Sequence, residues 1–121
     1  MKLVLAEPES EALGTYVAGL SRPLVSNVML RVEAIRAVRV GAKSETAVAE
    51  MRAALAGVTF VALDHATLRR SETIEPAALR TLDAVHLVTA LDVGAREMVV
   101  YDRRLAEAAR LHGLDAVSPG A

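Results

Sequence analysis

The fold is decided by LRTLDAVHLVTALDVGAREMVVYDRRL, residues 79–105 of the chain. The first half of this segment is apolar on nearly every side, which predicts a helix that is packed over most of its surface. Pro76 suits the first turn of this helix, and Gly94 suits the position after its last turn. The next residues, Glu97–Tyr101, are bulky and apolar, which predicts a strand covered on both faces of a parallel sheet.

One carboxylate, Asp83, lies on the predicted helix in an apolar neighbourhood. Leu79 and Leu87 lie one turn away on either side, so we expect the Asp83 side chain to point toward apolar surface. A carboxylate there must be paired, hydrogen-bonded or bound to a metal, because an isolated buried charge is very costly. A purely structural role, with Asp83 bonded to His86 or to an arginine, stays open at this point.

A second carboxylate, Asp102, directly follows the predicted strand and opens the helix RRLAEAARLHG. Capping of that helix is one explanation for an aspartate at this position. The carboxyl ends of parallel strands are also where open α/β sheets place their ligands. The position of Asp102 therefore favours a functional role, although its residue type alone does not.

Composition limits the classes of protein that this chain can be. Its 121 residues suit one domain with a single core. Hydrophobic residues make up 53% of the chain and aromatic residues 2%, so the core must consist of Ala, Val and Leu. The formal net charge of −1 gives no overall basic field that would recruit nucleic acid, and so few aromatic residues cannot form a base-stacking platform.

The redox and membrane signals point to the cytoplasm. The chain has no cysteine, which excludes disulfides and thiolate metal sites and fits a reducing compartment. No apolar run approaches the roughly 20 residues of a membrane span. We therefore expect a soluble, cytoplasmic protein.

Helices and strands are expected to alternate along the chain, which predicts a single α/β domain with a small parallel sheet between two helical layers. The opening MKLVLA looks like the last turns of a helix, and Asp64 and Ser44 are expected helix caps. Arg69 and Arg70 are expected on a solvated face. The further expected helices cover residues 9–20, 27–41, 45–57 and a short stretch after 64, and the further expected strands cover 24–26, 58–63 and 115–118.

The helix predicted over residues 27–41, with Ser26 or Asn27 as its cap, carries a third acid, Glu33. This helix has two expected apolar faces, and we expect Glu33 to project with the second of them. A surface Glu33 paired with Arg36 or Arg39 is the alternative. The two expected faces are Val28, Val32 and Ile35, and Met29, Leu30, Ala37 and Val40.

Glu33, Asp83 and Asp102 each follow or accompany a strand, so all three can lie at one end of the sheet. Carboxylates without cysteine form a hard-oxygen site that suits Mg²⁺ or Mn²⁺. Without a metal such acids raise one another's pKa values. With divalent ions they can orient and deprotonate a water and offset charge on a phosphate, which is the chemistry of phosphodiester hydrolysis.

Residues 79–120, together with VSNVMLRVEAIRA and LAEPESEAL, resemble PIN-domain proteins, specifically the VapC-type toxin ribonucleases of bacterial toxin–antitoxin pairs. The resemblance covers essentially the whole chain and is most specific around Asp83 and in the VYD ending at Asp102. It implies a PIN-like three-layer α/β/α fold, a Mg²⁺- or Mn²⁺-dependent endoribonuclease and a cognate antitoxin. In this resemblance Glu33, Asp83 and Asp102 match the second, third and last acids of the family's metal-binding cluster.

The resemblance also implies a difference at the start of the chain. Family members begin with a buried central strand that ends in an aspartate, whereas this chain starts within the following helix. We therefore expect the central strand and the first acid to be missing, through a start codon placed too late or because the chain is a remnant.

Two functions follow. The first is RNA cleavage by a toxin, with Arg80, Arg103 and Arg104 either holding phosphates or neutralising the acids. The second is a non-catalytic remnant that binds the antitoxin or associates with itself as a homodimer. A phosphoacceptor domain is excluded, because Lys2 and Lys43 are the only lysines and neither follows a late strand.

Overall fold

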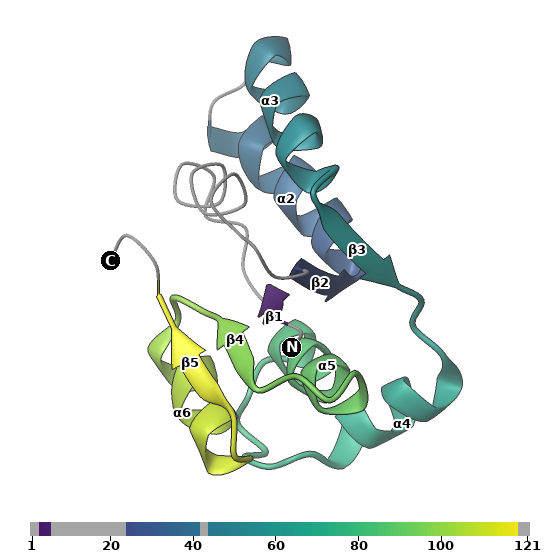
Figure 1. Cartoon of the computed structure of the whole chain (residues 1–121), viewed down its shortest axis with the longest axis vertical. Helices are drawn as coiled ribbons and strands as arrows, with labels where there is room; N and C mark the ends of the chain where they lie inside the picture. The colour runs from purple at the N-terminus through teal and green to yellow at the C-terminus, as the bar shows by residue number, and fades with distance from the viewer. Residues whose placement is uncertain (1–2, 6–23, 42–43, 119–121) are drawn as a thin grey trace.

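A computed structural model describes residues 3–5, 24–41 and 44–118. In these residues five parallel strands form one sheet, in the order β3-β2-β1-β4-β5 (Figure 1). The strands are β1 Leu3–Leu5, β2 Leu24–Asn27, β3 Val58–Val61, β4 Glu97–Val99 and β5 Asp115–Val117. The helices are α2 Val28–Gly41, α3 Glu45–Leu55, α4 His65–Thr73, α5 Thr81–Asp92 and α6 Arg103–Leu111. None of these helices is long and apolar enough to cross a membrane. The helix expected over residues 9–20 lies outside the described residues.

The expectation of a missing central strand is wrong. Leu3–Leu5 forms β1 at the centre of the sheet and pairs in parallel with β2 and with β4. A short apolar run such as LVL suits a buried strand as well as a helix end, and periodicity cannot separate the two. The facing edges of β2 and β4 need backbone partners, which decides in favour of the strand. The residues that directly follow β1 lie outside the described part, so the absence of a first acid stays a prediction.

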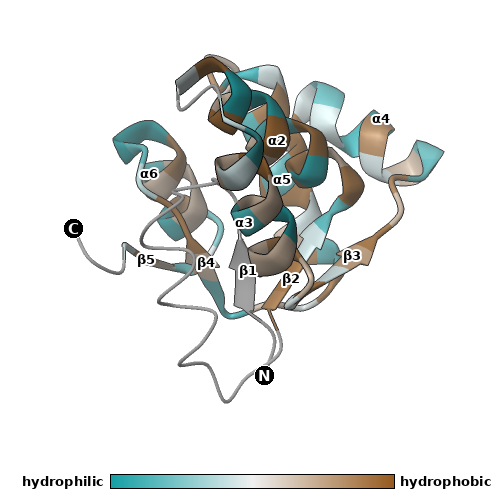
Figure 2. Ribbon diagram, turned by 90° about the horizontal axis from the view of Figure 1, so that it is seen from above, coloured by the Kyte–Doolittle hydropathy of each residue, from teal (hydrophilic) through white to brown (hydrophobic). Residues whose placement is uncertain are grey.

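Both faces of the sheet are covered by helices, as the sequence predicts. Successive side chains of a strand point to opposite faces. Val25 and Met98 pack in one cluster with residues of α5 and α6. Leu24 and Val99, their neighbours in sequence, pack in another cluster with residues of α2 and α3. Figure 2 shows much of β2 and β3 in the brown of hydrophobic residues.

Helix α2 buries a narrower stripe than the sequence predicts. Its buried residues are Leu30, Ala34 and Val38, which are spaced four apart and form one ridge. Val28, Val32 and Val40, which the sequence assigns to apolar faces, are exposed by 43%, 48% and 75%. Only one side of α2 meets the sheet and α3, so the valines on its other sides remain at the surface.

The sequence predicts the C-terminal end of α5 correctly but not its N-terminal end. Gly94 follows the helix with a φ of 69°, the left-handed conformation that glycine adopts without strain. Pro76 is not in the first turn, because the backbone N–H of Leu79 donates to the carbonyl of Pro76 in a separate turn. The helix therefore begins later, at Thr81.

Side chains cap α3 and α4 as predicted. Ser44 Oγ accepts a hydrogen bond from the backbone N–H of Ala47 at 3.0 Å. Asp64 Oδ1 accepts one from Thr67 at 2.8 Å, and this bond holds the pKa of Asp64 below its ordinary value. These bonds satisfy backbone donors that have no partner within the helix.

Helix α4 is joined to α5 mainly through polar groups. Thr67 Oγ1 donates to Asp92 Oδ2 at 2.8 Å, and the Arg70 guanidinium forms an ion pair with the same carboxylate. Thr67 is the one buried residue of α4. Arg69 and Arg70 are both exposed, as the sequence predicts, and Arg70 has the ion pair with Asp92 in addition.

Two leucines on α6 test the position of the core. Leu105 is fully buried whereas Leu111 is 69% exposed. Leu105→Ala should lower the free energy of unfolding by about 2–5 kcal/mol, because it leaves a cavity. Leu111→Ala, the matched control on the same helix, should change it by less than about 0.5 kcal/mol. Equal losses in urea unfolding would contradict the placement of α6.

Candidate active site

The strand order has a switch point between β1 and β4. The chain adds strands on one side of β1 up to β3 and then returns to its other side with β4. Open α/β sheets bind their ligands at such a switch point, outside the carboxyl ends of the strands. Asp102 follows β4 and lies at this edge of the sheet.

Helices bring the other two acids to the same edge. Helix α5 leads into β4, so its first turn, which holds Asp83, lies at the carboxyl edge. Helix α2 begins where β2 ends and carries Glu33. The negative charges of Asp102 and Glu33 both act on Asp83, which places the three carboxylates in one neighbourhood.

Asp83 is a half-buried acid without a hydrogen-bond donor among the described residues. Its burial, and next the negative charge of Asp102, raise the pKa of Asp83 above its ordinary value. The Arg80 guanidinium acts in the opposite direction. In the described part of the chain, neither His86 nor an arginine forms a hydrogen bond with Asp83, although the charges of His86 and Arg80 both act on it.

Asp102 caps α6, as the sequence predicts. Its Oδ2 accepts a hydrogen bond from the backbone N–H of Leu105 at 2.9 Å. This bond also fixes the carboxylate at the edge of the sheet, close enough to Asp83 to raise the pKa of that residue. Asp102 can therefore cap α6 and also belong to the acidic site.

Glu33 has an unexpected partner. The sequence suggests Arg36 or Arg39 as its alternative partner, but Glu33 Oε1 lies 2.6 Å from His86 Nε2. The His86 side chain is fully buried, and the Glu33 side chain is 24% exposed. Glu33 therefore reaches from α2 across to α5 while staying accessible at the edge.

Asn27 and Thr89 complete a buried polar network that sequence reasoning missed. Asn27 Nδ2 lies 3.0 Å from His86 Nδ1 and donates to Thr89 Oγ1 at 3.1 Å. The sequence analysis treats Asn27 only as a helix cap, a role that its bond to the N–H of Met29 confirms. The available signal was the presence of Asn, His and Thr within otherwise apolar, buried segments, since buried polar groups require partners.

The three acids fit a hard divalent cation by their chemistry. They offer carboxylate oxygens only. Burial, and next the negative charge of Asp102, raise the pKa of Asp83, and a bound cation would favour the ionised carboxylate against both effects. In the described part of the chain, however, no three Asp, Glu or His side chains are grouped as ready metal ligands. The acids share one edge, but Glu33 is turned toward His86, so the predicted metal site stays a prediction.

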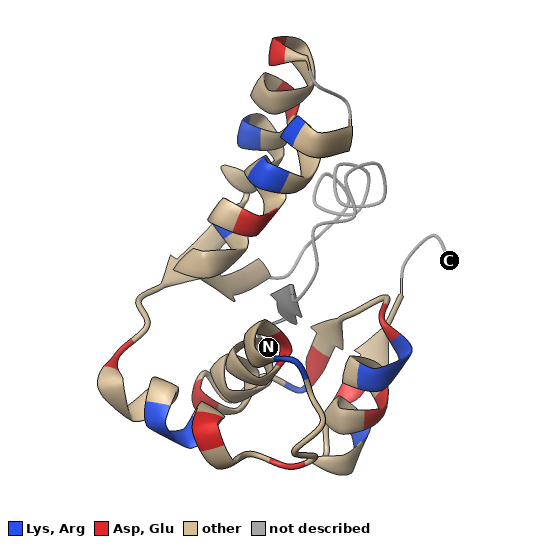
Figure 3. Cartoon of the chain, turned by 180° about the vertical axis from the view of Figure 1, so that it is seen from behind, with Lys and Arg blue, Asp and Glu red and all other residues tan. Residues whose placement is uncertain are grey.

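Arginines surround this edge and continue along the neighbouring helices. Arg103 and Arg104 are exposed at the start of α6, and Arg80 is exposed immediately before α5. Figure 3 shows further basic residues in blue along α2 and α3. These guanidinium groups are available for phosphate oxygens, which they match in geometry.

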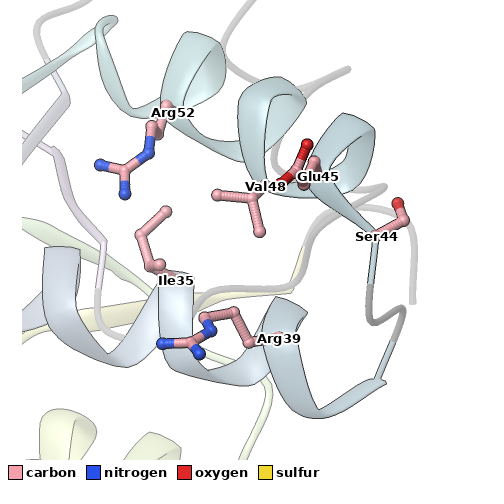
Figure 4. A pocket seen from close by; sticks show the side chains of 6 residues that line it. All are labelled: Ile35, Arg39, Ser44, Glu45, Val48 and Arg52. Atoms are coloured by element: carbon pink, nitrogen blue, oxygen red, sulfur yellow. The ribbon is translucent and has the colours of Figure 1, made fainter.

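The surface has two hollows between neighbouring helices. One, of about 560 Å³, lies between α2 and α3, where Arg39 and Arg52 flank the apolar side chains of Ile35 and Val48 (Figure 4). The other, of about 730 Å³, lies between α4 and the start of α5 and is lined in part by Ala84 and Val85. The second hollow adjoins Asp83 in sequence.

Comparison with known proteins gives a consistent result. The PIN domain matches residues 1–111. Ribonuclease VapC46 of Mycobacterium tuberculosis (strain ATCC 25618 / H37Rv) is 37% identical over 121 residues, which are 98% of this chain and 91% of that protein. Ribonuclease VapC47 of strain CDC 1551 / Oshkosh is 37% identical over 127 residues, with 99% and 91% covered. Ribonuclease VapC35 of the same strain is 34% identical over 126 residues, with 99% and 91% covered.

The raised pKa of Asp83 predicts a stability that depends on pH. The folded state binds a proton at Asp83 more tightly than the unfolded state, so stability falls as pH rises from about 3.9 through the folded-state pKa. Asp83→Asn should therefore raise the melting temperature at neutral pH, and this gain should vanish below about pH 3.9.

Asp64 provides a control of opposite sign, because its pKa is lowered by a bond from Thr67. Asp64→Asn should not stabilise the protein at neutral pH. Thermal unfolding of both variants from acid to neutral pH checks the pair. A neutral-pH loss of stability in Asp83→Asn would show that Asp83 is held by favourable partners and not by repulsion.

Proposed function

Since the chain belongs to the PIN-domain family, as one of its VapC-type toxins, we propose that it is a Mg²⁺-dependent endoribonuclease. One observation carries the proposal. Asp83 is a half-buried carboxylate whose pKa is raised by burial and by Asp102 at the carboxyl edge of the sheet. A group of like charges at a ligand-binding edge favours a bound cation, and hard oxygen donors favour Mg²⁺ or Mn²⁺.

Glu33, Asp83 and Asp102 would hold the ion. Bound there, a divalent ion supplies an activated water and offsets charge on the phosphate under attack. The chain's own contribution is to keep these carboxylates in place. The Leu105 N–H fixes Asp102, His86 fixes one oxygen of Glu33, and the packed helix α5 carries Asp83.

RNA is the proposed substrate, in keeping with the names of the relatives. Arg80 lies close enough to Asp83 to act on its pKa, so it can contact a phosphate next to the site of cleavage. Arg103 and Arg104 extend the same positive edge. Because the overall charge is only −1, binding depends on these local arginines and should weaken with added salt.

The proposed partner is a cognate antitoxin that covers the acidic edge, and the proposed location is the cytoplasm. A homodimer is also proposed. Val28 and Val32 are exposed one turn apart on α2, and they offer apolar area to a second copy.

The same exposed valines favour the second candidate function, a non-catalytic module that binds the antitoxin or itself. The two functions differ in one observable. The module would bind antitoxin without any cleavage of RNA, whereas the nuclease would do both.

Cleavage of a labelled single-stranded RNA by the purified chain tests the proposal. Activity should require Mg²⁺ or Mn²⁺ and disappear with EDTA. Asp83→Asn should lower the cleavage rate by more than about 100-fold, because changes to residues behind the ligands alone cost about 10–100-fold. This variant is expected to be more stable at neutral pH, so unfolding would not explain the loss.

Glu107→Gln is the matched control, since Glu107 is an exposed acid on α6 away from the carboxyl edge. It should cleave at the original rate. Cleavage that persists in EDTA and in Asp83→Asn would refute the proposed mechanism. Antitoxin binding without cleavage under any metal would favour the non-catalytic module.

A further inference from the structure

We infer that Asn27 is a positioning residue, which sets the proton of His86 on Nε2 so that His86 holds Glu33 at the acidic edge. The role given to Glu33 rests on the proposed nuclease function, whereas the role of Asn27 toward His86 does not. The inference follows from five hydrogen bonds whose directions can be assigned one after another.

The orientation of the Asn27 amide comes first. The backbone N–H of Met29 can only donate, and it lies 2.9 Å from the atom assigned as Asn27 Oδ1. A flipped amide would set an N–H group against this N–H. The Oδ1 atom therefore faces the start of α2, and the Nδ2 atom, with its two hydrogens, faces α5.

The hydroxyl of Thr89 fixes the next direction. Thr89 Oγ1 donates its single hydrogen to the carbonyl of Val85 at 2.8 Å. Its oxygen then accepts one hydrogen from Asn27 Nδ2 at 3.1 Å. The other hydrogen of Nδ2 is left for His86 Nδ1, which lies 3.0 Å away.

His86 Nδ1 must therefore accept, so it carries no proton. The ring proton lies on Nε2 and is donated to Glu33 Oε1 at 2.6 Å. An imidazolium would set Nδ1–H against an N–H of Asn27, in a place where no solvent reaches because His86 is fully buried. The contact between His86 and Glu33 is thus a hydrogen bond from a neutral ring to a carboxylate.

This arrangement limits how Glu33 can move. His86 engages one oxygen, Oε1, and in the described part of the chain no donor engages the other. The engaged oxygen fixes the direction of the side chain, and the second oxygen stays available at the accessible edge. Polar groups behind a metal ligand commonly orient it in this way.

Asn27→Asp is the informative variant because it keeps the shape and the acceptor for the Met29 N–H. It replaces the Nδ2 amino group by a second carboxylate oxygen, so the donor is lost and a negative charge is added. A carboxylate at position 27 can accept from Nδ1–H but cannot donate to it, so the variant should place a proton on His86 Nδ1. Thr89→Ser is the matched control, since it keeps the hydroxyl and should leave the His86 proton on Nε2.

Nitrogen NMR of histidine-labelled protein reads the protonation of each ring nitrogen directly. The chain has three histidines, so His65 and His112 act as internal references. His86 of the original protein should show a protonated Nε2 and an unprotonated Nδ1, and Asn27→Asp should show a protonated Nδ1. A protonated Nδ1 in the original protein, or an unchanged spectrum in Asn27→Asp, would overturn the inference.

Cleavage assays then test the consequence for Glu33. Asn27→Asp should lower kcat by about 10–100-fold with a smaller change in KM, whereas Thr89→Ser should retain the original kcat. An altered His86 spectrum with an unchanged kcat would refute the link to Glu33. If the original protein cleaves no RNA, the nuclease proposal fails, and the spectra still decide the role of Asn27.

Discussion

The hydrogen bond between His86 and Glu33 is the contact on which the organisation of the acidic edge depends. It joins two helices that belong to different layers of the molecule, α2 on one face of the sheet and α5 on the other. Because His86 is fully buried, both of its ring nitrogens need partners, and Asn27 at the end of β2 supplies the second one. One buried ring therefore sets the relative position of a strand end and two helices.

The elements around Asp83 and Asp102 were predictable because local chemistry determines them. Gly94 is the residue that tolerates the left-handed turn after α5, and Asp102 caps α6 with its own side chain. The buried strand β4 follows from its apolar composition. The alternation of helices and strands was enough to predict a parallel sheet with helices on both faces. The structure agrees, because Leu24 and Val25 pack against helices on opposite faces of the sheet.

Other features depended on contacts between distant parts of the chain. Leu3–Leu5 lies in a strand because β2 and β4 both need a neighbour, which composition cannot show. The partner of Glu33 lies 53 positions further along the chain, whereas sequence spacing favoured Arg36 and Arg39, which lie within two turns on the same helix. The buried ridge of α2 runs through Ala34, a small residue that hydrophobic patterns undervalue. In each case tertiary packing overrode a local preference.

The polar attachment of α4 has a consequence for motion. This helix buries only Thr67 and is held to α5 through the Asp92 carboxylate, so few apolar contacts would be lost if it detached. Local opening free energies are lowest where apolar contacts are few. The amide hydrogens of α4 should therefore exchange with solvent sooner than those of the buried helix α5. Since α4 also forms one wall of the hollow that Ala84 and Val85 line, such opening would widen this hollow.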